Sequence, residues 1–275
     1  MTFQLGKLIT AILGLAMILT CAPSVDAQEA SFEQRKRSQA FFRAVRQQVD
    51  ESLFVRTQNS GHLEISHDAP VRWAEAPENY GSVRIWTYRK RPELFATFTQ
   101  VIAPQKKPLQ AHYTAIGESP ISCSRSGRKT WQTTSKSTKF ARVPFTADPD
   151  ESRTRRVAAM PKMARGFSVQ LEGRRGTKSL KLKTTPLYRY DAPDAGAING
   201  AIFGFFDGEK PAALLIIEAR DAGAGKAWYY SFARHSQERL VGRHRNRQVW
   251  TAQALSEDDV NKHRQPYTIF TGGGV

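Results

Sequence analysis

Cysteine is scarce in this chain of 275 residues, which contains only Cys21 and Cys123. Cys21 falls in an N-terminal segment with the features of a signal peptide, so we expect the mature chain to keep a single thiol. One thiol cannot form an intrachain disulfide, and the protein must therefore be stabilised by its core alone. A lone cysteine can also be a nucleophile, but no Cys–His signature accompanies Cys123, which favours a small buried side chain.

Long hydrophobic runs are also missing. The apolar run Leu8–Leu19 has 12 residues, whereas a helix needs about 20 to cross a bilayer. Lys7 precedes this run, and Val25-Asp26-Ala27 follows it as a small-residue cleavage site. These features predict a secretory signal peptide over residues 1–27, with cleavage after Ala27.

Two alternatives to cleavage at this site remain open. One is an uncleaved N-terminal anchor, which the short apolar run disfavours. The other is a lipoprotein attached through Cys21, which Thr20 disfavours because a smaller residue is usual before the cysteine. We therefore expect an exported protein, periplasmic or extracellular, with no transmembrane segment after cleavage.

Familiar catalytic and phosphate-binding motifs are absent from the sequence. There is no G-x-S-x-G elbow and no H-E-x-x-H pair. The string Gly223-Ala-Gly-Lys226 resembles part of a phosphate loop, but Ala227 replaces the required hydroxyl residue, so a hairpin loop is the better interpretation. The densest group of metal-ligand types is His62, Glu64, His67 and Asp68, but strand alternation places His67 on the face opposite His62 and Glu64 unless a turn intervenes. We expect no metal, no cofactor and no recognisable catalytic residue.

Among the acidic residues, one carboxylate is a candidate for an unusual environment. Glu218 follows the apolar run Leu214-Leu-Ile-Ile217. A buried carboxylate with a raised pKa is a functional candidate, although a satisfied ion pair is the more common outcome.

The composition shows what the chain does contain. Hydrophobic residues make up 40% and aromatic residues 10%, which supports a packed core and excludes wholesale disorder. The mean hydropathy of −0.49 excludes a protein made of several membrane spans.

An internal repeat runs through the chain at an offset of 119 residues. The matching pairs are Gly81 and Gly200, Pro92 and Pro211, Arg128 and Arg247, and Trp131 and Trp250. Several spacings that coincide at one offset predict two similar halves.

Each half is expected to be a helix followed by an antiparallel sheet of about five strands, which gives an α+β fold. The first half covers 28–132 and the second covers 153–275, with a polar linker over 133–152, although the two halves can also form one continuous domain. The first helix is expected over 31–54, because its apolar residues recur every three or four positions; a membrane-surface helix is the alternative. The second is expected over 153–172, where Pro161 must kink or restart it.

A set of short strings resembles an uncharacterised family of exported proteins found in planctomycete bacteria. The strings are Pro70-Val-Arg-Trp73, Gly81-Ser-Val-Arg-Ile-Trp86, Arg91-Pro92-Glu93, Pro186-Leu-Tyr-Arg-Tyr190, Gly200-Ala-Ile-Phe203, Leu214-Leu-Ile-Ile-Glu-Ala219, Arg247-Gln-Val-Trp250 and His263-Arg-Gln-Pro-Tyr267. The resemblance covers nearly the whole mature chain. It implies no activity, cofactor or catalytic residue.

Positive charge is in clear excess, with 41 Lys and Arg against 25 Asp and Glu and a net charge of +16. Much of it falls in expected turns, and two clusters precede Trp131 and Trp250. The candidate anion-binding residues are Arg125, Arg128, Lys129, Arg243, Arg245 and Arg247. Basic turns beside aromatic residues can contact acidic polysaccharide or lipid head groups, although a merely soluble surface is the alternative. Nucleic acid is a poor target for an exported protein.

These features favour a non-enzymatic binding or structural protein of the cell envelope, with basic turns that contact an anionic surface. The alternatives are a hydrolase without a recognisable motif and a periplasmic carrier of lipid or lipoprotein with an apolar cavity. A large apolar pocket with few charges would favour the carrier, and a His–acid pair or convergent acids in a cleft would favour the enzyme.

Overall fold

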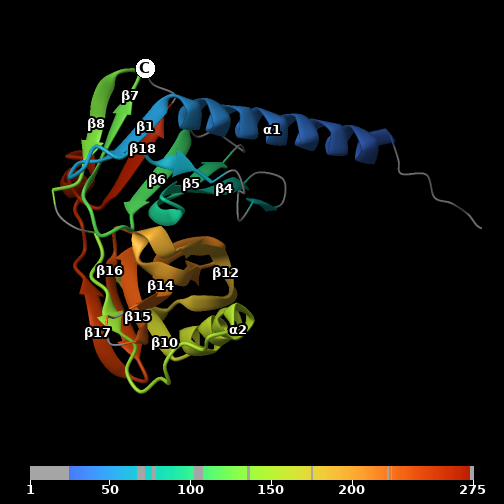
Figure 1. Ribbon diagram of the computed structural model, residues 1–275. Coiled ribbons are helices and arrows are strands. Elements are labelled where there is room, and N and C mark those ends of the chain that lie inside the picture. The colour runs from blue at the N-terminus through green and yellow to red at the C-terminus, as the bar shows by residue number, and fades with distance from the viewer. Residues whose placement is uncertain are drawn as a thin grey trace, which may run out of the picture. The chain divides into compact units, whose positions relative to one another are not determined.

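The computed structural model describes residues 25–66, 72–75, 79–101, 108–134, 137–174, 176–221, 223 and 225–272 (Figure 1). Most of the expected signal peptide and His67 lie outside these ranges. Contacts divide the chain into two units, residues 1–37 and residues 38–275. All the strands belong to the second unit.

The helices differ from the expected boundaries. Helix α1 covers Val25–Asp50 and starts earlier than expected, because Ala27 to Ala30 are good helix formers. Helix α2 covers Arg153–Ala164, runs on through Pro161, and ends well before residue 172. The two short helices are η1 (Pro193–Ala195) and α3 (Glu257–Asn261). Among the residues placed by the structure, no helix is both long and apolar enough to span a membrane.

The first large sheet has the strand order β18-β6-β5-β4-β2, and β3 also pairs with β4. All of its pairs are antiparallel. Its strands are β2 (Glu64–Ile65), β3 (Arg72–Glu75), β4 (Asn79–Tyr88), β5 (Arg91–Val101), β6 (Leu109–Ala115) and β18 (Tyr267–Gly272). The last strand of the chain thus forms one edge of this sheet.

The second large sheet has the order β12-β13-β14-β15-β9 and is also antiparallel. Its strands are β9 (Ala141–Arg142), β12 (Lys181–Ala192), β13 (Ala197–Asp207), β14 (Lys210–Asp221) and β15 (Lys226–Arg234). Strand β9 comes from the stretch expected to be a linker, and it forms the edge beyond β15.

Two smaller antiparallel sheets carry the remaining strands. One has the order β1-β7-β8 and the other β11-β10-β16-β17. Their strands are β1 (Ser52–Arg56), β7 (Ile121–Arg125), β8 (Arg128–Gln132), β10 (Phe167–Gly173), β11 (Gly176–Ser179), β16 (Arg239–His244) and β17 (Arg247–Ala252). The fold is therefore mainly β with a few helices, within the broad α+β class that the sequence predicts.

Strand pairs that lie 119 residues apart in the sequence have the same register. In the β4–β5 pair of strands, Trp86 faces Leu94, and a bulge shifts the register directly after Trp86. In the β13–β14 pair, Phe205 faces Ala213, and a bulge shifts the register directly after Phe205. In the smaller sheets, Cys123 faces Trp131 and Gly242 faces Trp250, each immediately before a bulge.

Three hydrophobic clusters form the core. The first contains Phe41 of α1 and Trp131 of β8, and the second contains Met160 of α2 and Phe232 of β15. The third joins the two large sheets, since its members come from β4 and β5 of the first sheet and from β12–β15 of the second. Strands β5 and β14 are consequently buried on both faces. Polar side chains at this junction need partners inside the protein, because water cannot reach them.

Candidate functional site

The first basic hairpin is β7–β8. Arg125, at the end of β7, forms an ion pair with Glu51 at 3.3 Å. Arg128 and Lys129 are exposed on β8, and the Lys129 amino group donates a hydrogen bond to Gln132 at 2.7 Å. Two of these three cations therefore face solvent without an acidic partner in the described part of the chain.

The second basic hairpin is β16–β17. Arg245 and Arg247 are exposed and Arg243 is half-buried. Figure 1 shows the β7–β8 hairpin at the upper left and the β16–β17 hairpin at the lower left. The structure thus places the six candidate residues in two separate groups of three.

Glu218 lies in a buried ion-pair network at the junction of the two large sheets. Arg91 of β5 donates two hydrogen bonds to the Glu218 carboxylate, at 2.9 and 3.0 Å. The Tyr190 hydroxyl donates a third at 2.6 Å, and Arg220 donates a fourth at 2.5 Å. The Glu218 side chain is only 1% exposed. The Glu218 carboxylate accepts all these hydrogen bonds from groups of the protein itself, so its role is structural.

Glu118 and Glu93 border this network. Glu118 receives hydrogen bonds from both arginines, at 2.8 Å from Arg91 and 3.3 Å from Arg220. Burial raises the pKa of Glu93 to about 7, despite the neighbouring arginines. Its Oε2 atom is buried without a hydrogen-bond partner among the described residues. Among Glu93, Glu118 and Glu218, Glu93 is thus the carboxyl group whose negative charge is least stabilised.

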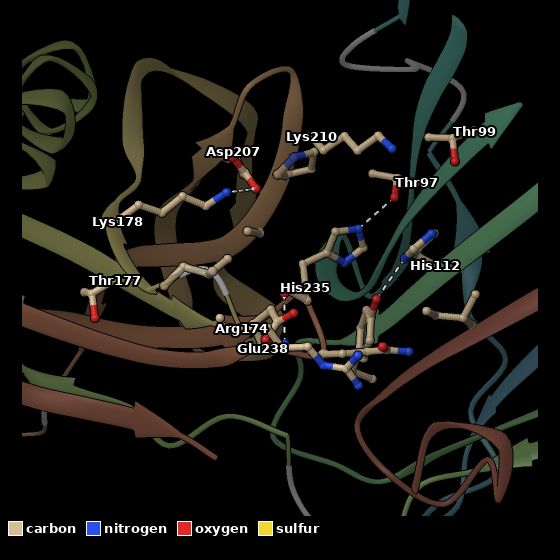
Figure 2. Close-up of a pocket in the computed structure, with 18 of the residues that line it drawn as sticks. Thr97, Thr99, His112, Arg174, Thr177, Lys178, Asp207, Lys210, His235 and Glu238 are labelled. Carbon is tan, nitrogen blue, oxygen red and sulfur yellow. Dashed lines mark hydrogen bonds and ion pairs between the residues drawn. The ribbon is translucent and has the colours of Figure 1, made fainter. Parts of the chain in front are cut away.

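A pocket of about 540 Å³ lies on another side of the same junction (Figure 2). Strands β5, β6 and β18 of the first large sheet form one wall, and the β10–β11, β13–β14 and β15–β16 connections form the other. The polar and charged residues that line it are Thr97, Thr99, His112, Arg174, Thr177, Lys178, Asp207, Lys210, His235, Ser236, Gln237, Glu238 and Tyr267. Apolar atoms nevertheless make up more of the lining surface than polar atoms do, and the volume suits a small molecule that has both polar and apolar parts.

His235 sits at the inner end of the pocket between two threonines. The Thr114 hydroxyl donates to the carbonyl of Arg234 at 2.9 Å, so it must accept from Nδ1–H of His235, 2.7 Å away. Nε2 then carries no proton and accepts from the Thr97 hydroxyl at 2.8 Å. Burial lowers the pKa of His235 well below its usual value. The imidazole is therefore neutral, with its orientation fixed by two hydroxyl groups.

The loop after His235 is fixed by Arg234. The Arg234 guanidinium donates hydrogen bonds to the carbonyls of Ser236, Gln237, Glu238 and Gln253, at 2.6–3.0 Å. These bonds set the shape of this wall of the pocket.

His112 and Tyr267 form a second polar pair in the wall. His112 Nδ1 lies 2.8 Å from the Tyr267 hydroxyl. Burial, together with the nearby charge of Lys210, lowers the pKa of His112 to about 4. Burial also raises the pKa of Tyr267. Both groups are therefore neutral near pH 7, so the positive charge of the pocket comes from its Lys and Arg residues.

The charged residues of the pocket leave two cations without acidic partners. Lys178 pairs with Asp207 at 2.5 Å. Lys210 and Arg174 make no ion pair with any residue that the structure places. Figure 2 shows the Lys210 side chain directed toward Thr97 and Thr99 on the opposite wall. An anion in the pocket would meet an amino group and hydroxyl groups together.

Sequence patterns did not identify this pocket. His112 and His235 lie far apart in the sequence and belong to no motif, and their partners come from distant strands. The available signal was a polar residue at every second position, as at Thr97 and Thr99 or at Gln110, His112 and Thr114.

The earlier metal candidate gains no support from the described residues. His62 forms an isolated bridge with Val55, and His67 lies outside the described ranges. In the part of the chain that the structure covers, no three His, Cys, Asp or Glu side chains are placed to hold a metal ion.

Comparison with known proteins adds no relative. No family model, curated protein or solved structure matches the chain. The resemblance to the planctomycete family therefore stays an expectation, and the site itself is the only guide to function among the described residues.

Proposed function

We propose that this protein is a non-enzymatic binding protein whose site is the pocket between the two large sheets, and that it binds a small anionic molecule there. The observation that carries this proposal is Lys210, which has no acidic partner in the described ranges and faces hydroxyl groups across the pocket. An unpaired cation at the mouth of a preformed pocket is a ready partner for an anion. The net charge of +16 would also raise the rate of encounter with anions.

The test is a titration of the protein with small anions, followed through the imidazole signals of His112 and His235 in NMR spectra. Both rings line the pocket, so a bound anion should shift their signals in a saturable way. Gln237→Trp fills the pocket from its wall and should abolish the shifts. Gln248→Trp makes the same change at an exposed position of β17 and should leave them intact. If no anion shifts either histidine, the proposal fails.

A hydrolase is the alternative with one observation in its favour, the hydrogen bond from the Thr97 hydroxyl to His235. A hydroxyl beside an imidazole is the arrangement of an activated nucleophile. However, burial lowers the pKa of His235 well below its usual value, and its other nitrogen is held by Thr114 rather than by a carboxylate. Both features weaken the imidazole as a general base. Ester hydrolysis that disappears in Thr97→Val would reverse this ranking.

The basic hairpins support a second part of the proposal, in which the exported protein contacts an anionic surface of the cell envelope. Arg128, Lys129, Arg245 and Arg247 are exposed, with no acidic partner in the described segments. Because the two hairpins lie apart in Figure 1, each would bind by itself.

Its test is binding to vesicles that contain an anionic phospholipid or to an acidic polysaccharide. Binding should weaken as salt rises from roughly 0.05 to 0.5 M, since the screening length falls to a few ångströms. Replacing Arg243, Arg245 and Arg247 by Ser should weaken it further and leave the melting temperature nearly unchanged. Salt-insensitive binding, or unfolding of the triple variant, would show that the charges have a structural role only.

The two similar halves expected from the sequence are also part of the proposal. The equal registers and bulges at an offset of 119 residues support them. The two edge strands support them too, because β9 follows the first set of strands and joins the second sheet, whereas β18 follows the second set and joins the first. If β9 is counted with the first half, each half would then contribute its last strand to the sheet of the other.

A further inference from the structure

The pocket and the buried ion-pair network occupy matching places in the two proposed halves. At the offset of 119 residues, Lys210 corresponds to Arg91 and Thr99 corresponds to Glu218. Arg91 and Glu218 belong to the network, and Lys210 and Thr99 line the pocket. The network and the pocket are therefore equivalent positions at the junction of the sheets. Protein side chains fill the first position, and the second is open.

The ion-pair network shows that this position at the junction of the sheets can hold a carboxylate. Glu218 brings a carboxylate group there, and Arg91 binds both of its oxygens at 2.9 and 3.0 Å. A carboxylate held in this way is buried and fully hydrogen-bonded.

The open place has the cation but lacks the carboxylate. Thr99 is shorter than Glu218, and no acidic group pairs with Lys210 in the described ranges. Figure 2 shows the Lys210 side chain directed toward Thr97 and Thr99, as the correspondence with Arg91 and Glu218 requires. A ligand can supply the missing group.

We propose, on the basis of the anion-binding function above, that the pocket binds the carboxylate of a small organic acid, with Lys210 in the role that Arg91 has toward Glu218. The rest of the acid would lie against Leu171, Pro211 and Ile269.

A singly charged acid fits this pocket better than phosphate. The lining includes two carboxylates of its own, Asp207 and Glu238, and these repel a second negative charge on the ligand. Lys210 also presents a single point charge, and Arg174 is the one further cation of the pocket without an acidic partner among the described residues.

The experiment compares benzoate with benzamide, and adds inorganic phosphate as a third probe, by calorimetric titration of the protein at pH 7. Benzamide has nearly the same shape as benzoate without the charge. We expect benzoate to bind at least about ten times more tightly than benzamide or phosphate, because a charge-assisted hydrogen bond contributes that much.

Two variants and one control assign the binding to Lys210. Lys210→Gln should weaken benzoate binding about ten-fold or more and leave the weaker benzamide binding unchanged. Thr99→Glu places a carboxylate where the ligand would lie and should abolish benzoate binding. Lys162→Gln removes the same charge from an exposed position of α2 and should have no effect. If Thr99→Glu does not fold, Lys210→Gln alone decides the question.

The outcomes separate this inference from the function on which it rests. Phosphate binding that exceeds benzoate binding, or benzoate binding that Lys210→Gln does not alter, overturns the inference but keeps an anion-binding pocket. If none of the three probes binds and the histidine signals do not respond to any anion, both proposals fail.

Discussion

Glu93 is the side chain for which burial and charge conflict most directly. Burial raises its pKa from 4.5 to about 7, and its Oε2 atom has no partner among the described residues. The folded protein therefore retains this proton over a pH range in which the unfolded chain releases it. The contribution of Glu93 to stability is fully present below pH 4.5 and is lost as the pH rises to about 7.

Glu93→Gln removes the charge that causes this loss. At pH 8 the variant should be more stable than the wild type, by up to about 3 kcal/mol, whereas at pH 4.5 the difference should be small. Urea unfolding at the two pH values measures it. Glu64→Gln, at an exposed position, is the control and should show no such dependence. An equal gain at both pH values would mean that the carboxyl charge is not the cause.

Sequence patterns predicted burial at single residues better than they predicted partners. The interpretation of Cys123 as a buried side chain is confirmed, since it is 4% exposed and burial raises its pKa to about 11. Glu218 was identified as unusual, but its partner Arg91 lies 127 positions away in the sequence. Short-range sequence patterns indicate which side chains are buried. An ion pair between residues 127 positions apart depends instead on how the two sheets pack.

At the scale of elements, several hairpin turns adopt left-handed backbone conformations. Ser126 and Gly127 have φ values of 49° and 77°, and Arg245 and Asn246 have 46° and 67°. In the β4–β5 turn, Arg89 and Lys90 have 49° and 64°. Residues other than Gly, Asn and Asp are strained there, because the Cβ atom approaches the following carbonyl oxygen.

Lys90→Gly should relieve this strain in the β4–β5 turn. We expect the free energy of unfolding to rise by about 0.5–1 kcal/mol, since the relief exceeds the entropy that glycine loses on folding. Lys90→Ala removes the same charge but keeps the Cβ atom, so it should bring no gain. Thermal unfolding of both variants measures the effect, and a gain of equal size in Lys90→Ala would attribute it to charge.

Element types were predicted more accurately than element boundaries. Strands β4 and β5 lie in the first stretch expected to form a sheet, and β13 and β14 lie in the second. The helix expected over 153–172 ends at Ala164, because Phe167–Gly173 can pair with both β11 and β16. Strand β9 was not expected, since a pair of residues in a polar stretch has no pattern and becomes a strand only through the edge of β15.

At the scale of the molecule, the two edge strands tie the proposed halves together. Strand β18 pairs with β6 through Tyr267–Gly272, and β9 pairs with β15 through Ala141–Arg142. The offset of 119 residues predicted the similarity of the halves, but nothing in it predicted where their last strands would pair. The pocket depends on this exchange, because Tyr267 and Ile269 of β18 form part of its wall.

The exchange predicts how the protein behaves when the chain is cut between its halves. Ala147 and Asp148 are exposed and lie between β9 and α2, so a protease site can be inserted there. Each fragment then contributes an edge strand to the sheet of the other, and the third hydrophobic cluster also joins the two. We expect the cut protein to elute as one species in gel filtration without denaturant, and the fragments to separate only in urea. The uncut insertion variant controls for the insertion itself. Fragments that separate under native conditions would contradict the exchange, since neither half should be stable when its sheet has lost an edge strand and the shared cluster is exposed to water.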